Sequence, residues 1–238
     1  MENICKSIIA GCDEAGRGCV IGPLVVAGIS VTEDREGELR RIGVKDSKLL
    51  AQPKREKLAK QIEEIAKDIV VMKVSPCKID AFRMEGVDMN RIEALKFADI
   101  IKMLKPHLAY IDAPDTNLGH FHMIMTKLVG ARPEGPELVV RHKADRDFPV
   151  VSAASIIAKV ERELEISRLK EEFRDSGDFG TGYTSDERTI EWLRAWLKKN
   201  REFPEHLVRR SWVTSSMLKG EREQTCLLGW VRGIVKQP

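Results

Sequence analysis

The residues best placed to do chemistry are two adjacent carboxylates near the amino end of the chain. Asp13 and Glu14 follow an apolar run at residues 7–12, and Gly16-Arg17-Gly18 comes almost directly after them. A strand that ends in acid and then in flexible, basic backbone is suited to holding a metal ion beside a phosphate group. This segment is therefore a candidate metal site.

Two further acids stand at the ends of other apolar runs. Asp112 ends the run at residues 108–112, and Asp145 follows the run at residues 138–142. If these runs are parallel strands, their acids emerge at the carboxyl edge of the sheet, where ligand crevices form. Glu14 joins this edge if the chain already turns after Asp13. Clustered carboxylates repel one another unless a cation is present, and hard divalent cations prefer oxygen ligands. Two such ions can hold the attacking and leaving oxygens of a phosphoryl displacement.

Plainer interpretations compete with this one. A single acid at a strand end is usually a turn residue or a helix cap, and Asp115 and Asp147 fit that description. The glycines from Gly16 to Gly22 partly match a dinucleotide-binding loop, but the third is one position late and an apolar strand follows instead of a helix. Two alternatives remain for this loop: a plain turn, or a close approach of backbone to a ligand with Arg17 near phosphate.

The elements that must position these residues alternate along the chain. Five apolar runs predict strands, at residues 7–13, 24–31, 69–74, 108–112 and 138–142. Helical periodicity predicts helices at residues 54–66, 91–104, 152–173 and 186–199, the third with Ser152 as its N-cap. A short glycine-rich link favours an antiparallel hairpin for the first two strands, and intervening helices favour parallel crossovers for the later ones.

These elements predict an α/β fold, a mixed five-stranded sheet flanked by helices. Glycine-rich residues 176–182 interrupt the pattern. We expect a main α/β domain at residues 1–174 and a small, mostly helical appendage at residues 180–238.

Composition sets broad limits on the function. The 238 residues are 42% hydrophobic and 32% charged, which is typical of a soluble domain with a packed core. The net charge of +3 permits a nucleic-acid partner without requiring one. Five cysteines without a C-x-x-C pair argue against a disulfide framework and a structural zinc site. We see no signal peptide and no membrane-length apolar stretch, so we expect a cytoplasmic protein.

Several segments together resemble the ribonuclease HII family, the type 2 ribonucleases H, in its archaeal single-chain form. The resemblance spans residues 7 to about 190, and it is carried by residues 13–18 with 21–23, by Asp46-Ser47-Lys48-Leu49, by Tyr110-Ile111-Asp112, by residues 143–145 and 150–160, and by Gly182-Tyr183-Thr184-Ser185-Asp186. The first and fifth segments are long and stand in the right order.

The resemblance implies a ribonuclease H-like fold and a metal-dependent nuclease. It implies a four-carboxylate site of Asp13, Glu14, Asp112 and Asp145 that binds Mg²⁺ or Mn²⁺. The implied reaction is endonucleolytic cleavage of RNA in RNA–DNA hybrids, and cleavage 5′ of single ribonucleotides embedded in duplex DNA. The products are 3′-hydroxyl and 5′-phosphate ends, and we expect the enzyme to be a monomer.

The resemblance also implies a set of substrate contacts. The backbone of Gly16, Arg17 and Gly18 would contact the ribose 2′-hydroxyl, the group that distinguishes RNA from DNA. Tyr183 would stack on the neighbouring deoxyribose. Lys48, with Ser47 beside it, would contact phosphate.

The carboxyl-terminal residues leave two interpretations open. Cationic side chains gather near Trp212, namely Lys198, Lys199, Arg201, Arg209 and Arg210. They form either a second contact with duplex or a solvated helix face. A sliding-clamp motif, which some relatives carry near this end, is not evident in residues 226–238.

Two alternative functions also stand. One is another two-metal nuclease of the same fold group, such as a junction resolvase. The other is a non-catalytic nucleic-acid-binding module, which would have no need of clustered acids opposite phosphate.

Overall fold

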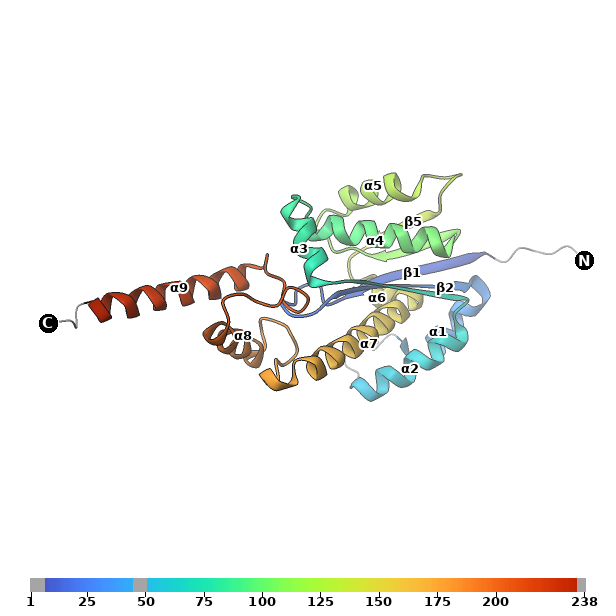
Figure 1. The fold of residues 1–238 in the computed structure, drawn as a ribbon. Coiled ribbons are helices and arrows are strands. Elements are labelled where there is room, and N and C mark those ends of the chain that lie inside the picture. Colours follow the sequence, from blue (N-terminus) through green and yellow to red (C-terminus); the bar gives the residue numbers. More distant parts are fainter. Residues whose placement is uncertain (1–6, 45–50, 235–238) are drawn as a thin grey trace, which may run out of the picture. The chain divides into compact units, whose positions relative to one another are not determined.

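The computed structural model describes residues 7–44 and 51–234 (Figure 1). The predicted phosphate contacts Ser47 and Lys48 lie outside the described residues. The chain divides into two compact units. Unit 1 contains the chain up to residue 17 together with residues 24–73 and 87–163, and unit 2 contains residues 18–23, 74–86 and those from 164 onward.

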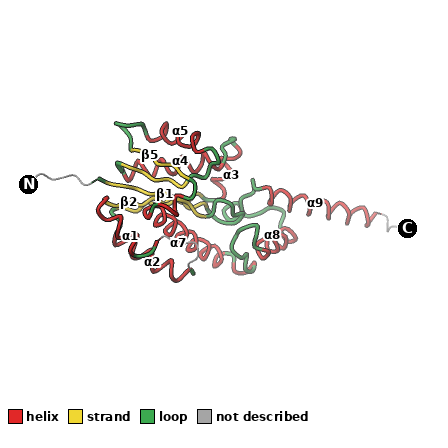
Figure 2. Tube along the Cα trace, turned by 180° about the vertical axis from the view of Figure 1, so that it is seen from behind, coloured by secondary structure: helices red, strands yellow, loops and turns green. Residues whose placement is uncertain are grey.

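Unit 1 is built on a five-stranded sheet (Figures 1 and 2). Its strands are β1 (Ile8–Ala15), β2 (Leu24–Thr32), β3 (Asp68–Val74), β4 (Leu108–Asp112) and β5 (Glu137–Arg141). The order across the sheet is β3-β2-β1-β4-β5. β1 is antiparallel to β2 and parallel to β4, and β4 is parallel to β5. The predicted mixed sheet and its hairpin are confirmed.

Helices cover both faces of this sheet. α4 (Met89–Leu104) and α5 (Leu118–Val129) lie on one face, and α1 (Glu36–Arg41), α2 (Gln52–Ile65) and the first part of α7 (Pro149–Glu172) lie on the other (Figure 1). Between β5 and α7 comes the short helix α6 (Ala144–Asp147). The main apolar core packs side chains of β1 and β2 against α2 and α7.

Two predicted boundaries are wrong, for local physical reasons. α7 begins at Pro149, where a proline fits the first turn, so Ser152 lies inside the helix and is not its N-cap. The Ser152 hydroxyl instead donates to the carbonyl oxygen of Asp145. The strand β1 continues to Ala15 opposite Val25, so the chain does not turn at Glu14.

Unit 2 is mostly helical, as predicted for the carboxyl-terminal part of the chain. It contains α3 (Pro76–Met84), the end of α7, α8 (Glu187–Lys199) and α9 (Val213–Ile234). Residues 18–23 are held within unit 2 by hydrogen bonds, because the backbone nitrogens of Val20 and Ile21 donate to the Gly182 carbonyl at 2.8 and 3.1 Å. Within the described part of the chain, none of the helices is both long and apolar enough to cross a membrane.

Arg209 fits neither the predicted duplex contact nor the predicted solvated helix face. Its side chain is fully buried in unit 2. Its guanidinium donates to the Gly22 carbonyl at 3.1 Å and to the Cys19 sulfur at 3.0 Å, and it lies 4.8 Å from the Trp212 ring centre. A buried arginine with these contacts organises the interior of unit 2 and cannot form a solvated face.

Candidate metal centre

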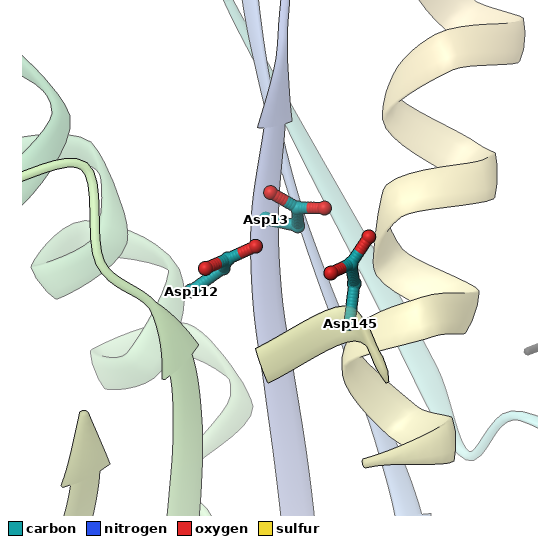
Figure 3. Close-up of side chains that lie close together, drawn as sticks. All are labelled: Asp13, Asp112 and Asp145. Atoms are coloured by element: carbon teal, nitrogen blue, oxygen red, sulfur yellow. The ribbon is translucent and has the colours of Figure 1, made fainter. Parts of the chain in front are cut away.

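Three aspartates converge at the carboxyl edge of the sheet in unit 1. Asp13 comes from β1, Asp112 is the last residue of β4, and Asp145 comes from α6 (Figure 3). One carboxylate oxygen from each lies within 4.8 Å of the others. Asp13 and Asp145 are only 6% and 4% exposed, and Asp112 is half-buried. The structure therefore brings together three of the four predicted acids in one small cluster.

The strand pairing explains this convergence. β1 and β4 are parallel neighbours, with Cys12 opposite Ile111, so Asp13 and Asp112 leave the sheet at the same edge. α6 follows β5 directly, and the Ala144 nitrogen donates to the Asp112 carboxylate at 3.3 Å. This bond fixes the start of α6 beside the strand ends and so places Asp145 there.

The electrostatics of the cluster favour a cation. The pKa of Asp13 is raised to about 6, mainly by burial and to a smaller extent by the neighbouring charge of Asp112. A hydrogen bond from Ser155 and one from the Glu14 nitrogen, at 2.8 Å, act in the opposite direction and lower this pKa. Buried oxygen ligands whose charges oppose one another fit a hard divalent ion such as Mg²⁺ or Mn²⁺.

Glu14 lies on the other side of the strand. Because β1 continues through Glu14, alternation directs its side chain toward the face covered by α4, opposite to Asp13. Its carboxyl is half-buried, and its pKa is raised well above the ordinary value by burial and by the charges of Asp13 and Glu93. Arg17 lowers this pKa. The charges of the cluster thus raise the pKa of Glu14, but Glu14 is not one of the three carboxylates that converge.

The loop after β1 is held by the side chain of Arg17. Its guanidinium donates to the fully buried Glu93 carboxylate and, at 2.6 Å, to the Asn90 side-chain oxygen, both on α4. Gly16 has a φ of 83°, which glycine adopts without strain. The Arg17 side chain is therefore engaged by contacts within the protein. The ligand contact predicted for the loop backbone stays a prediction.

Two further predicted contact residues, Gly18 and Tyr183, lie in unit 2. Gly18 is exposed, with open space where a side chain would stand. Tyr183 is half-buried, and its backbone forms a bridge with Cys19. The positive φ of Gly182, 82°, makes the turn that precedes Tyr183, and a Cβ there would meet the Ile21 carbonyl.

Sequence reasoning gave no role to two residues of α7. The Lys159 ammonium donates to the Ser155 hydroxyl at 2.9 Å, and Ser155 in turn bonds Asp13. Their four-residue spacing places them on one helix face, which was a usable signal. The partners of Arg17 had no such signal, because Glu93 and Asn90 lie more than 70 positions away in the sequence.

Comparison with known proteins decides the family. The profile of the family described as Ribonuclease HII matches residues 10–215. The chain belongs to the ribonuclease HII family. The ribonuclease HII of Archaeoglobus fulgidus is 49% identical over 210 residues, 88% of this chain and 96% of that relative. That of Pyrococcus furiosus is 44% identical over 225 residues, 92% of this chain and 96% of the relative.

Solved structures agree with this ribonuclease HII assignment. The crystal structure of the ribonuclease H2 from Pyrococcus horikoshii has a TM-score of 0.82 at 40% identity, over 91% of this chain and 99% of that one. The ribonuclease HII of Archaeoglobus fulgidus in a complex with PCNA has a TM-score of 0.78 at 48% identity, over 89% and 96%. Ribonuclease HIII, solved with Mn²⁺, shares the fold with a TM-score of 0.75 at 20% identity, over 93% of this chain and 72% of that one.

Family membership establishes the class of reaction. The protein is an enzyme, a metal-dependent hydrolase of phosphodiester bonds with ribonuclease H activity on RNA–DNA hybrids. The junction resolvase and the non-catalytic binding module are both set aside.

Proposed function

We propose that this ribonuclease HII is an endonuclease that works with two divalent ions, Mg²⁺ or Mn²⁺, held by Asp13, Glu14, Asp112 and Asp145. The observation that carries the proposal is the convergence of three carboxylates, two buried and one half-buried, within 4.8 Å of one another. Oxygen ligands alone, at the edge of an open sheet, match the needs of phosphoryl transfer assisted by such ions.

The protein's own groups divide the work. Divalent ions bound at the cluster would lower the pKa of the attacking water and neutralise charge that develops on the phosphate. Asp13, central and buried on β1, is the ligand we expect to be shared, and Asp112 and Asp145 complete the cluster from either side. Glu14, whose pKa is raised by the charge of Asp13, would supply the fourth carboxylate from the α4 face.

We further propose that the enzyme cuts duplex DNA on the 5′ side of a single embedded ribonucleotide and leaves 3′-hydroxyl and 5′-phosphate ends. The backbone of Gly16, Arg17 and Gly18 would contact the 2′-hydroxyl, while α4 holds the Arg17 side chain. Tyr183 would stack on the next deoxyribose. Ser47 and Lys48 keep their proposed phosphate contacts on the resemblance alone.

One assay tests this proposal. A labelled DNA duplex with one ribonucleotide, an RNA–DNA hybrid and a four-way DNA junction are incubated with the enzyme in Mg²⁺, in Mn²⁺ and in chelator. We expect cleavage of the first two substrates, with a cut 5′ of the single ribonucleotide and none in chelator. Cleavage of the hybrid alone would contradict the ribonucleotide-reading role of residues 16–18 and Tyr183.

The variant Asp13→Asn tests the centre itself. It should lose at least about a thousandfold in turnover, because a shared ligand of both ions is removed. Hybrid binding, measured by fluorescence anisotropy in Ca²⁺, should remain. Turnover near that of the unaltered enzyme would contradict the assignment.

We propose that the enzyme acts as a monomer in the cytoplasm. The three converging acids all come from one chain, so a second copy is not needed to complete the cluster. Light scattering after size exclusion should give the mass of one chain, 26.9 kDa, and a dimer mass would contradict the proposal.

A further inference from the structure

Two side chains of α7 form a chain of hydrogen bonds that ends on Asp13. Lys159 donates from its ammonium nitrogen to the Ser155 hydroxyl oxygen at 2.9 Å. Ser155 is almost completely buried, 1% exposed, and its side chain is hydrogen-bonded to the Asp13 carboxylate. Lys159 is half-buried and acts on the same carboxylate through its charge.

The chemistry of Lys159, Ser155 and Asp13 decides which group donates each of these hydrogen bonds. A lysine ammonium only donates hydrogen bonds, and a serine hydroxyl has one hydrogen to give and lone pairs to accept with. Because Lys159 occupies a lone pair of the Ser155 oxygen, the serine hydrogen is directed to Asp13. The carboxylate therefore receives an oriented donor that is backed by a full positive charge.

The balance of charge at the cluster suggests a role for these hydrogen bonds. Asp13, Asp112 and Asp145 lie within 4.8 Å of one another, so without an ion their charges are close and poorly solvated. The Lys159 ammonium, which acts on Asp13 through its charge, offsets part of that repulsion in the metal-free enzyme. The same cation repels a divalent ion that binds at the cluster.

We propose that Lys159 and Ser155 are positioning residues of the metal centre: Ser155 fixes the Asp13 carboxylate, and Lys159 supplies a counter-charge that keeps the empty cluster assembled and limits how tightly divalent ions bind. The proposal rests on the proposed role of Asp13 as a metal ligand. It predicts that the two residues, although in contact, affect metal affinity in opposite directions.

The experiment is a titration of the full-length, metal-free protein with Mn²⁺, followed by calorimetry and by the Mn²⁺ electron paramagnetic resonance signal. Lys159→Met should bind Mn²⁺ about five- to tenfold more tightly, as expected when a unit charge no longer repels a divalent ion through a water-like medium. Lys159→Arg, which keeps the charge, should stay within about twofold. Ser155→Ala should bind about tenfold more weakly, because loss of a group that orients a ligand costs roughly that much.

Controls separate this inference from general damage. Lys60→Met removes an exposed lysine of α2 and should leave the affinity unchanged. Thermal unfolding in chelator gives a second readout: Lys159→Met should melt earlier than the unaltered protein there, and Mn²⁺ should raise its melting temperature by more. This readout needs only a cooperative transition, so it serves even if the variant is weakened.

The outcomes are distinguishable. Mn²⁺ affinity of Lys159→Met equal to that of Lys60→Met, or lower, overturns the counter-charge role even if Asp13→Asn abolishes binding. Unchanged affinity in Ser155→Ala overturns the positioning role. If the unaltered protein and Asp13→Asn bind Mn²⁺ alike, the proposed metal centre itself is wrong.

Discussion

At the scale of single residues, the fold keeps Asp13 in a place that disfavours its charge when no ion is bound. Its pKa is raised to about 6, chiefly by burial, whereas the unfolded chain has an ordinary aspartate near 4. Between these values the folded protein holds a proton that the unfolded protein releases. The stability that this group contributes is thus present at low pH and lost as the pH rises through 6.

Asp13→Asn should therefore stabilise the metal-free protein at pH 8, by about 2 kcal/mol, and have almost no effect at pH 4. Urea unfolding in chelator at the two pH values measures the difference. Saturating Mg²⁺ should reverse the order at pH 8, because only the unaltered protein gains binding energy. Equal stability of the two proteins at pH 8 in chelator would show that the carboxylate is not under this strain.

Arg17 makes a second prediction at this scale. Arg17→Ala withdraws the guanidinium from the buried Glu93 carboxylate and should lower the free energy of unfolding by about 2 kcal/mol, since the pair is partly shielded from water. The matched control is Arg132→Ala, whose 2.8 Å pair with Glu137 is exposed on both sides and should cost less than about 1 kcal/mol. Equal losses in urea unfolding would contradict the structural role of the Arg17–Glu93 pair.

At the scale of elements, the position of the acids depends on how closely β1 approaches α7. A Cβ on Gly11 would lie 2.5 Å from the backbone nitrogen of Val151. The nearest atoms are all backbone, so no flexible side chain can move aside to make room. Gly11→Ala should therefore destabilise the protein by roughly 3 kcal/mol or more, as overpacking of a rigid core does. Gly37→Ala on α1 is the control, with open space around it, and should be neutral or slightly stabilising. Melting temperatures of the two variants give the test, and similar values would contradict the close packing of β1 on α7.

Elements are also where the sequence was most informative. Apolar runs and helical periodicity predicted all five strands and the helices α2, α4, α7 and α8, because both patterns are local, but they did not predict α5 or α9. The last residues of β1 were missed, since two acids and a glycine give no sign that pairing with β2 continues to Ala15. Ser152 was misassigned because its hydroxyl donates to the Asp145 carbonyl of the preceding helix α6, and a serine that makes such a contact looks the same in sequence as an N-cap.

The site shows the same division. Three of its acids could be predicted from their places at strand ends, because parallel strands share an edge. The partners that hold Arg17 could not, since a contact across more than 70 residues leaves no mark on local spacing. Arg209 looked like a surface cation for the same reason, although its guanidinium is enclosed by the segment around Cys19 and Gly22.

At the scale of the whole molecule, unit 2 is assembled from three separate stretches of the chain, residues 18–23, 74–86 and those from 164 onward. A sequence pattern runs along the chain and divides it at single points, so it cannot reveal such an assembly. The short stretch 18–23 depends on the last one: Val20 and Ile21 bond Gly182, and the Gly22 nitrogen donates to the Leu207 carbonyl at 2.9 Å. Residue 17 and the acids belong to unit 1, so the glycine loop begins in one unit and ends in the other.

Deletion of residues 164–238 should therefore leave a protein that does not fold cooperatively. The fully buried Val20 and Ile21 would lose their apolar neighbours Phe179, Leu207 and Val208, and their backbone nitrogens would lose their partners. We expect poor solubility, binding of an apolar dye and no cooperative thermal transition. Deletion of residues 225–238 is the control, because it keeps those contacts together with the buried Leu218, and it should melt cooperatively. A sharp, reversible transition in the larger deletion would mean that the stretch 18–23 does not need its carboxyl-terminal partners.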